Sequence, residues 1–594
     1  DTLAKGICSR ETLKKYESGK CSPEKLRADA LFQRLEKTVD PFYVKLDDAE
    51  YALARQRIKI QAELRRGKVA VAGDSILTYQ RMRGTNDVLH RQFLYLVQAE
   101  LRRRKKAPFL PQEEIITAGI EETFAGRKLS RNLLETRPFH LMELFLLQRY
   151  AVLLEEEGEI GEAVLWYEAL LTRFTNEQRG MADRQKLYPP IAYRLAFWLA
   201  KKGDFDQAMP IIRKALKLLR YSKIQNVMYI RLRELELTVL EKLGDSPYEE
   251  ERGYLKCLKK ILREDGAYWC EDFFPTYLEP HLYSVNTMLK ERRLAQGKTR
   301  EEMAGTICDP RTIERQEKNC SRPQKRVWKA LIHELGLSSL KYDRAIVTQE
   351  YKNIRKFELM IRAYDRGKIK ESLLLYKNLN DTVDKGELTN RQFEKYWGAE
   401  LRFRMGEISR EERNQQLWEM LSWTLPLENK GKSFACHLTK YEQEALDSLA
   451  WDCGRQEIKE LLPLLKKQFH RNVNVAEQSM DVGFYGKILY NIARGYLRTG
   501  DLRRAQKYIT LAMEQRRFQD QGVSWDRLLF LRFQIEEQRL NLWEKKIPPE
   551  SSEDEFRWAK CAWASAKENG DVSMCNFIVG YLKRHYRLEE IPWY

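Results

Sequence analysis

The sequence predicts an all-α protein made of two tandem units, each a small helical head followed by an α-solenoid of paired helices. Apolar residues recur at helical spacing, no segment alternates with the period of a strand, and the chain matches itself. With 594 residues the chain has room for several domains. We expect a first head at 1–37, a first array at 38–288, a second head at 289–337 and a second array at 338–594.

The two units follow from an internal repeat. Shifting the sequence by 300 positions aligns its first hundred or so residues without gaps, with about two dozen identities. Identical runs include "RGK" at Arg66 and Arg366, and "AELR" at Ala99 and Ala399. This self-similarity predicts a tandem duplication.

Paired helices are clearest near the end of each half. The stretch "YRLAFWLAKKGDFDQAMPIIRKALKLL" begins at Tyr193, and its match "YNIARGYLRTGDLRRAQKYITLAMEQR" begins at Tyr490. Each indicates a helix, a Gly-Asp turn and a second helix, with small residues where the helices approach. The pattern resembles the tetratricopeptide repeat, a helical hairpin of about 34 residues that stacks on its neighbours. The resemblance implies a curved solenoid whose inner surface suits an extended peptide.

The repeat pattern also implies which side chains face that inner surface. Aromatic rings give packing surface, while amide and guanidinium groups can bond a peptide backbone or a carboxylate. The alternative is that these are ordinary surface residues of a repeat. The candidate peptide-binding residues are Tyr193, Arg194, Phe197, Tyr490, Asn491 and Arg494.

The second head, residues 289–337, indicates four short helices. Thr299 followed by Glu302 fits a capping box, and Asp309 before Pro310 fits an N-cap with proline at the first helical position. The order of caps, tight turn and apolar positions resembles the helix-turn-helix domain of the Cro/repressor (Xre-like) type.

The first head contains the better copy of this motif, "GICSRETLKKYESGK", from Gly6 to Lys20. The resemblance implies a helix that begins at Ser9 and lies in the major groove of double-stranded DNA. Arg10 can form two hydrogen bonds with a guanine edge, while lysines neutralise phosphates. A merely solvated basic face is the alternative. The candidate DNA contacts are Ser9, Arg10, Glu11, Thr12, Lys14, Lys15 and Lys20.

The second copy has acidic residues where the first has Ser9 and Lys14, namely Asp309 and Glu314. An acidic group at the front of such a helix repels phosphate. Contact with the DNA backbone and a purely structural role are therefore both open for this copy. Its candidate contacts are Arg311, Arg315 and Lys318.

A helix-turn-helix head followed by tetratricopeptide repeats resembles the peptide-pheromone-sensing regulators of Gram-positive bacteria. Such regulators usually carry one head and one array, whereas this chain carries both twice, which implies an intramolecular pseudo-dimer or a homodimer with unequal heads. The duplication also implies that counterparts of residues 289–302 precede Asp1. We therefore expect the first head to lack its first helix because of a trimmed N-terminus.

Other classes are disfavoured by composition. The net charge of +18 favours a polyanionic partner. The sequence has no P-loop, Rossmann glycine signature or HExxH, so we expect no enzyme, no cofactor and no metal. It has no apolar run near the roughly 18 residues that span a bilayer, so we expect a cytoplasmic protein without a membrane partner. The ten dispersed cysteines are expected to be thiols rather than disulfides.

The leading hypothesis is a bacterial DNA-binding transcription regulator whose helical arrays bind a peptide or protein effector. The alternative is a protein- or peptide-binding adaptor whose DNA-binding heads are vestigial. Glu314 and the incomplete first head support that alternative.

Overall fold

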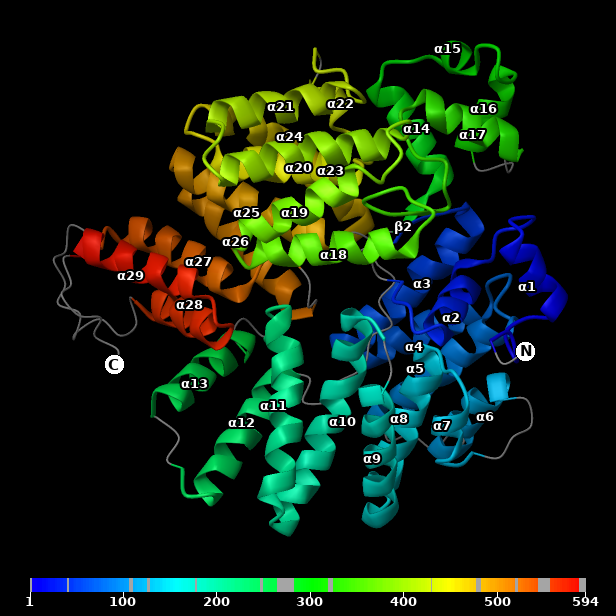
Figure 1. Cartoon of the computed structure of the whole chain (residues 1–594), viewed down its shortest axis with the longest axis vertical. Coiled ribbons are helices and arrows are strands. Elements are labelled where there is room, and N and C mark those ends of the chain that lie inside the picture. Colours follow the sequence, from blue (N-terminus) through cyan, green and yellow to red (C-terminus); the bar gives the residue numbers. More distant parts are fainter. Residues whose placement is uncertain are drawn as a thin grey trace. The chain divides into compact units, whose positions relative to one another are not determined.

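The computed structural model confirms the all-α class: 74% of it is helical, and the described residues form 29 helices and one small three-stranded sheet (Figure 1). By its internal contacts the chain divides into two compact units. Unit 1 comprises Asp1–Asp40, Leu53–Glu279 and Ile509–Tyr594, and unit 2 comprises Pro41–Ala52 and Pro280–Tyr508. The structure describes residues 3–39, 42–105, 111–124, 129–176, 179–245, 249–263, 282–318, 324–428, 430–476, 482–518, 522–542 and 556–586.

Unit 1 holds the first head, the helices of the first array and the last helices of the chain. The predicted boundaries follow the sequence repeats, whereas this unit follows long-range packing, so it also takes in the last helices of the predicted second array. Its helices are α1 (Arg10–Glu17), α2 (Lys25–Arg34), most of α3 (Asp48–Arg65), α4 (Val69–Gln80), α5 (Val88–Lys105), α6 (Gln112–Phe124), α7 (Leu133–Thr136), α8 (Leu141–Glu156), α9 (Ile160–Asn176), α10 (Met181–Lys202), α11 (Phe205–Tyr221), α12 (Val227–Lys242), α13 (Glu249–Arg263), the end of α26 (Leu502–Phe518), α27 (Trp525–Leu540), α28 (Arg557–Glu568) and α29 (Val572–Tyr586).

The predicted Gly-Asp hairpin is the pair α10 and α11. Gly203 ends α10 with φ of +87°, a left-handed conformation that glycine adopts without the cost of a Cβ. Ala196 and Ala208 are both fully buried. Small side chains at these positions allow the two helices to approach closely, as the sequence predicts.

Unit 2 holds the second head, most of the second array and the sheet. Its elements are β1 (Tyr43–Leu46), the start of α3, β2 (Leu282–Ser284), α14 (Val285–Ala295), α15 (Arg300–Ala304), α16 (Pro310–Glu317), α17 (Lys325–Glu334), β3 (Tyr342–Asp343), α18 (Tyr351–Asp365), α19 (Ile369–Asn380), α20 (Leu388–Arg404), α21 (Arg410–Ser422), α22 (Lys430–Ser433), α23 (Lys440–Asp452), α24 (Glu457–Ala476), α25 (Val482–Thr499) and the start of α26.

The sheet was not expected from the sequence. Its strand order is β2-β1-β3, with β1 parallel to β2 and antiparallel to β3. The strands are two to four residues long, too short to show a period, and their partners are far apart along the chain.

The predicted caps of the second head are confirmed. The Thr299 hydroxyl accepts a hydrogen bond from the Glu302 amide at 3.1 Å, and the Glu302 carboxylate accepts one from the Thr299 amide at 2.7 Å. Asp309 accepts from the Arg311 amide at 2.7 Å, and α16 begins at Pro310. Met303, Ala304 and Ile313 belong to a small hydrophobic core formed by this head itself.

The first head, in contrast, shares its core with the array. Ile7, Leu26 and Leu31 belong to the same cluster of buried residues as Phe145 of α8 and Leu216 of α11. The first head is therefore joined to its array by continuous apolar packing.

The expectation of free thiols is wrong for one pair of cysteines. Cys257 of α13 and Cys561 of α28 form a disulfide with a Cα–Cα distance of 5.7 Å. These residues are 304 positions apart, so no local spacing in the sequence points to the bond. The free cysteines among the described residues are Cys8, Cys21, Cys308, Cys436, Cys453 and Cys575.

Candidate nucleic-acid interface

The helix predicted to enter DNA, α1, is an exposed element of unit 1 with no buried residue. The Ser9 hydroxyl caps it by accepting a hydrogen bond from the Thr12 amide at 3.1 Å. This cap satisfies one of the amide groups that every helix leaves unpaired at its start. Among the seven predicted contacts, Thr12 is half-buried, and the exposed ones are Ser9, Arg10, Glu11, Lys14, Lys15 and Lys20.

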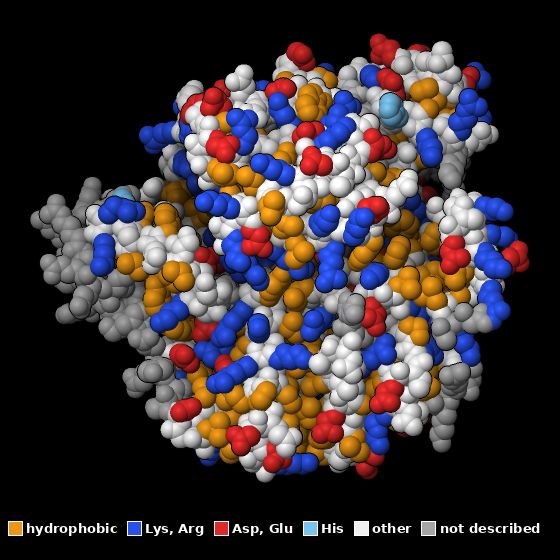
Figure 2. All heavy atoms as spheres, in the orientation of Figure 1, with side chains coloured by type: hydrophobic (Ala, Val, Ile, Leu, Met, Phe, Trp, Pro, Cys, Tyr) orange, Lys and Arg blue, Asp and Glu red, His pale blue; other side chains and the backbone are white. Residues whose placement is uncertain are grey.

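The exposed side of α1 is basic, and Figure 2 shows Lys and Arg side chains gathered where Figure 1 draws this helix. Lys15 and Glu11 lie 3.1 Å apart, but both side chains are well exposed. A pair of this kind contributes little to stability. The ammonium of Lys15 is therefore available to a stronger anion such as a phosphate.

In α16, the matching helix of the second head, more of the charged side chains pair with other side chains of the same head. Lys318 lies 2.6 Å from the carboxylate of Glu314 on the same helix. Glu317 is buried and accepts hydrogen bonds from Arg293 and Arg300. Burial alone would raise the pKa of Glu317, but these two guanidinium groups outweigh it and lower that pKa.

The three predicted contacts of the second head all remain at the surface. Arg311, Arg315 and Lys318 are exposed. Their neighbours on the helix are acidic, so this face combines both signs of charge. The arrangement favours weak contact with an anion over strong attraction.

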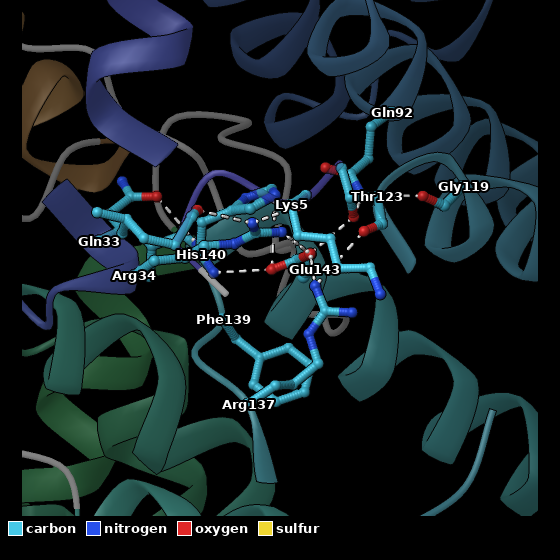
Figure 3. A network of polar contacts seen from close by, with 12 residues as sticks. Lys5, Gln33, Arg34, Gln92, Gly119, Thr123, Arg137, Phe139, His140 and Glu143 are labelled. Carbon is cyan, nitrogen blue, oxygen red and sulfur yellow. Dashed lines mark hydrogen bonds and ion pairs between the residues drawn. The ribbon is translucent and has the colours of Figure 1, made fainter. Parts of the chain in front are cut away.

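A buried polar network joins the first head to its array (Figure 3). Glu143 of α8 is fully buried, and its carboxylate accepts from the Arg34 guanidinium of α2 at 2.7 Å and from the Thr123 hydroxyl at 2.7 Å. Arg137 adds a third contact at 2.9 Å. The second carboxylate oxygen accepts from the His140 amide at 2.9 Å, which caps α8.

Arg34 extends this network to the turn that precedes α1. Its other guanidinium nitrogen donates to the carbonyl oxygens of Leu3 and Lys5, at 3.0 and 2.6 Å. A continuous chain of contacts therefore runs from Glu143 in the array to the segment that leads into the candidate DNA-binding helix.

A second contact fixes the same turn by close approach. Gly6 has φ of +75°, and a Cβ placed on it would lie 2.3 Å from the carbonyl oxygen of Thr123. Backbone atoms cannot move aside as a flexible side chain can, so only glycine fits. The head turn is packed directly on the end of α6.

The network shifts the titration of its two buried ionisable groups. Burial, assisted by Arg34 and other nearby cations, lowers the pKa of His140 to about 3, although Glu143 opposes the change. Burial would raise the pKa of Glu143, but His140, Arg34 and Arg137 outweigh it and lower that pKa to about 2. At neutral pH the carboxylate is therefore charged and the imidazole neutral.

The predicted peptide-binding residues of the first array remain partly open. Tyr193 and Phe197 are half-buried and stack on each other along α10, with ring centroids 6.2 Å apart. The Lys201 ammonium lies 5.0 Å from the Phe197 ring, and the Arg231 guanidinium of α12 lies 5.7 Å from the Tyr193 ring. Arg194 pairs with a carboxylate of α8 at 3.0 Å.

The corresponding residues of the second array stack and form hydrogen bonds between α23 and α25. Tyr490 is buried and stacks on Trp451 at 5.7 Å. Asn491 is 2% exposed and donates to Asp447 at 2.7 Å. Arg494 donates to the Trp451 carbonyl at 2.6 Å and lies over its ring.

Sequence reasoning missed Gly6, Arg34, Thr123 and Glu143. A capping signal was present, because Glu143 is three residues after the N-cap. The N-cap residue is His140, which is outside the usual set of serine, threonine, aspartate and asparagine. The partner from α2 is 109 residues away and leaves no local signal.

No described helix is both long and apolar enough to cross a membrane. Within the same ranges, no group of three or more His, Cys, Asp or Glu side chains is placed to hold a metal ion.

We expect Gly6→Ala to loosen the first head, because the added methyl group meets the backbone of Thr123. Amide hydrogen exchange in α1 and α2 should become about ten-fold faster. Gly19→Ala is the matched control, since Gly19 also has positive φ (+65°) but nothing lies within 4 Å of its Cβ position. Equal exchange in the two variants would show that the close contact does not hold the head.

We also expect acid to destabilise unit 1 through the buried pair. The unfolded chain binds a proton at His140 below its ordinary pKa of 6.5, whereas the folded protein does so only near 3. Glu143 acts in the same direction between 4.5 and about 2. The free energy of unfolding should therefore fall as pH drops from 6.5, and fall more steeply below 4.5.

Urea denaturation at a series of pH values measures this dependence. His140→Gln should flatten the part of the profile between pH 6.5 and 4.5. An unchanged slope in that variant would assign the acid sensitivity to other groups.

Comparison with known proteins gives no family. No protein-family model and no curated protein matches the chain. Among solved structures, PlcR of Bacillus thuringiensis in complex with the peptide PapR7 and DNA is 15% identical, covering 50% of this chain and 98% of its own, with a TM-score of 0.29. ComR from S. thermophilus in complex with DNA and its signalling peptide ComS is 16% identical, covering 51% and 100%, with a TM-score of 0.26. Likeness at these TM-scores carries no argument about this chain.

Proposed function

We propose that the protein is a cytoplasmic DNA-binding transcription regulator, in which α1 of the first head reads double-stranded DNA and the first array binds a peptide or protein effector. The observation that carries the proposal is the exposure of α1. The helix buries no residue, begins at a serine cap and carries several cations. Exposed cations on a capped surface helix suit the phosphates and base edges of DNA.

The difference in charge between the two heads supports different roles for them in DNA binding. From Ser9 to Lys20 the first copy has four basic and two acidic residues, whereas from Asp309 to Lys318 the second has three of each. Counterion release makes affinity depend on the number of phosphates that cations neutralise. The first head therefore reads sequence, and the second adds at most backbone contact through Arg311, Arg315 and Lys318.

Each residue of α1 has a distinct role in this proposal. Arg10 is at the leading end, where a guanidinium can bond O6 and N7 of guanine. Ser9 and Thr12 are short hydroxyl side chains that can approach a base edge or a phosphate. Lys14, Lys15 and Lys20 position the helix on the backbone without discriminating bases.

The effector surface belongs to the first array. Its candidate residues Tyr193 and Phe197 are partly open and are flanked by Lys201 and Arg231. Aromatic rings beside cations suit a peptide with aromatic and acidic side chains or a free carboxylate. The corresponding set in the second array is engaged between its own helices, so we propose one effector per chain.

The Arg34–Glu143 pair supports control of one site by the other. The pair connects α8 of the array to the turn before α1, so a shift of α8 on effector binding changes the position of the DNA-reading helix. Two unequal heads in one chain also imply an asymmetric DNA site, read by one chain or by a homodimer.

We expect Arg10→Ala to weaken binding to the preferred duplex by about 1–3 kcal/mol and to relax the preference at one base pair. Lys14→Ala should weaken binding to all sequences and lower the salt slope by about 1. Selection from random duplexes, followed by gel shifts at several salt concentrations, measures both effects.

Lys202→Ala is the control for the loss of a charge, because Lys202 is exposed at the end of α10 and is not among the predicted contacts. It should leave affinity and preference unchanged. If the full-length protein binds all duplexes equally, or ignores DNA while recovering a protein partner, the adaptor reading replaces the proposal.

We expect Phe197→Ala to weaken peptide binding by the first array, since it removes one of the two stacked rings. A library of short synthetic peptides tests this, with affinities measured by fluorescence anisotropy. Binding should weaken at least about ten-fold, the equivalent of 1.4 kcal/mol. Arg494→Ala in the second array should have no effect, and the reverse result would move the effector to that array.

A further inference from the structure

The disulfide of unit 1 joins two corresponding positions of the duplicated sequence. Cys257 ends the run "YLKC" in α13, and Cys561 ends the similar run "WAKC" in α28. The two positions differ by 304, close to the repeat offset of 300. In a two-fold dimer, a residue on the axis meets its own copy in the same way.

A network of polar contacts surrounds this disulfide bond. The carboxylate of Glu568, at the end of α28, is buried and accepts hydrogen bonds from Tyr229 and from Arg233, the latter at 2.9 Å. Arg220 lies 3.3 Å from the same carboxylate. All three donors come from α11 and α12, so the C-terminal hairpin is seated on the first array (α13 green, α28 red in Figure 1).

Other contacts between α28 and the first array are both aromatic and polar, and the rings of Tyr254 and Trp563 lie 5.6 Å apart. Gln225 donates to the Ser565 carbonyl at 3.0 Å and accepts from the Ser565 hydroxyl at 2.5 Å. Lys223 pairs with Asp571 at 2.5 Å. These polar groups find replacement partners in water when the interface opens.

The seat adjoins the proposed effector surface. Arg231, which lies over the Tyr193 ring, and the Glu568 partners Tyr229 and Arg233 all belong to α12. The docking of α28 therefore acts on the helix that borders that surface.

We propose that Cys257 and Cys561 form a redox-responsive clasp whose oxidation fixes the C-terminal hairpin α28–α29 on α12 and α13, and whose reduction releases it. In a reducing compartment a disulfide between cysteines so far apart in sequence is usually transient and redox-sensing. The reducing compartment and the consequence for the effector surface rest on the proposed function.

The chemistry is thiol–disulfide exchange with a low-molecular-weight disulfide such as oxidised glutathione. The Cys257 thiolate, which is half-buried and more accessible than Cys561, attacks one sulfur and releases one glutathione thiolate. The Cys561 thiolate then attacks the Cys257 sulfur of the mixed disulfide and releases the second. Two protein thiols are oxidised, one disulfide is reduced, and the two protons end on the two glutathione molecules.

Cys575 provides a matched control in the same hairpin. Burial is the main cause that raises the pKa of its thiol to about 11, so it stays protonated near neutral pH and reacts slowly. It is a free cysteine, and its thiol donates to the Trp563 carbonyl at 3.9 Å.

The test equilibrates the full chain in buffers that range from reduced to oxidised glutathione. A non-reducing digest with mass spectrometry quantifies the peptide that links Cys257 to Cys561, and amide hydrogen exchange reports on α12, α13 and α28. We expect the linked peptide to rise with oxidation and the exchange of α13 and α28 to slow about ten-fold with it. Cys257→Ser and Cys561→Ser should each remove the response, whereas Cys575→Ser should keep it.

Two results would overturn the clasp: no linked peptide at any glutathione ratio, or exchange in α13 and α28 that does not change while the linked peptide forms. The wild-type protein alone decides both, so a variant that folds poorly does not obscure the answer. The measurements use neither DNA nor effector, so their failure is distinct from failure of the gene-control proposal.

Discussion

In each half of the chain, the attachment of the head to the array depends on one buried carboxylate, Glu143 in the first half and Glu442 in the second. Neither side chain has exposed area. A charge in such a place is tolerated only when it is paired and fully hydrogen-bonded. Each carboxylate also caps the helix to which it belongs, through the amide of His140 or Thr439. The other partners are Thr123, Arg34 and Arg137 for Glu143, and Thr424 and Arg292 for Glu442. Withdrawal of Arg292 would remove the guanidinium that pairs with the buried Glu442, which costs about 3–5 kcal/mol, whereas Glu143 would keep Arg137 after withdrawal of Arg34. The buried pairs therefore attach each head to its array.

The arginine that pairs with the buried carboxylate comes from a different helix in each half of the chain. In the first, the arginine comes from α2, the last helix of the head, and in the second it comes from α14, the first helix of the head. The residue that corresponds to Arg34 in the second copy is Glu334, which pairs instead with Lys298 at 2.7 Å. The first head also shares its apolar core with the array, whereas the second has a core of its own. Unequal attachment gives the two heads different mechanical freedom, so an effector on one array need not act on both heads alike.

Local features were predictable from sequence, and distant pairings were not. Ser9, Thr299 and Asp309 were predicted as caps, because a cap needs only a side chain and the amides two or three residues later. The Gly-Asp turn and its buried alanines also follow from local spacing. Cys257–Cys561 and the contact of Gly6 with Thr123 join segments more than a hundred positions apart, and nothing in either segment specifies the partner. The sequence did contain one clue to the disulfide, since both cysteines end similar four-residue runs.

The small sheet pairs strands that lie about 300 positions apart in the sequence. Tyr43 pairs with Asp343, which is 300 positions later and thus its own counterpart in the repeat. Antiparallel pairing of a residue with its counterpart is what a two-fold dimer produces at its axis, and the disulfide repeats that relation in unit 1. Lys45 anchors the pairing by donating to the Ser338 carbonyl at 2.6 Å and to Asp343 at 3.1 Å. Within one chain such a contact forms at a high effective concentration and needs no second molecule. The two halves of one chain can differ in sequence, which the subunits of a homodimer cannot do. The exposed basic residues of α1 and the internally paired charges of α16 differ in this way.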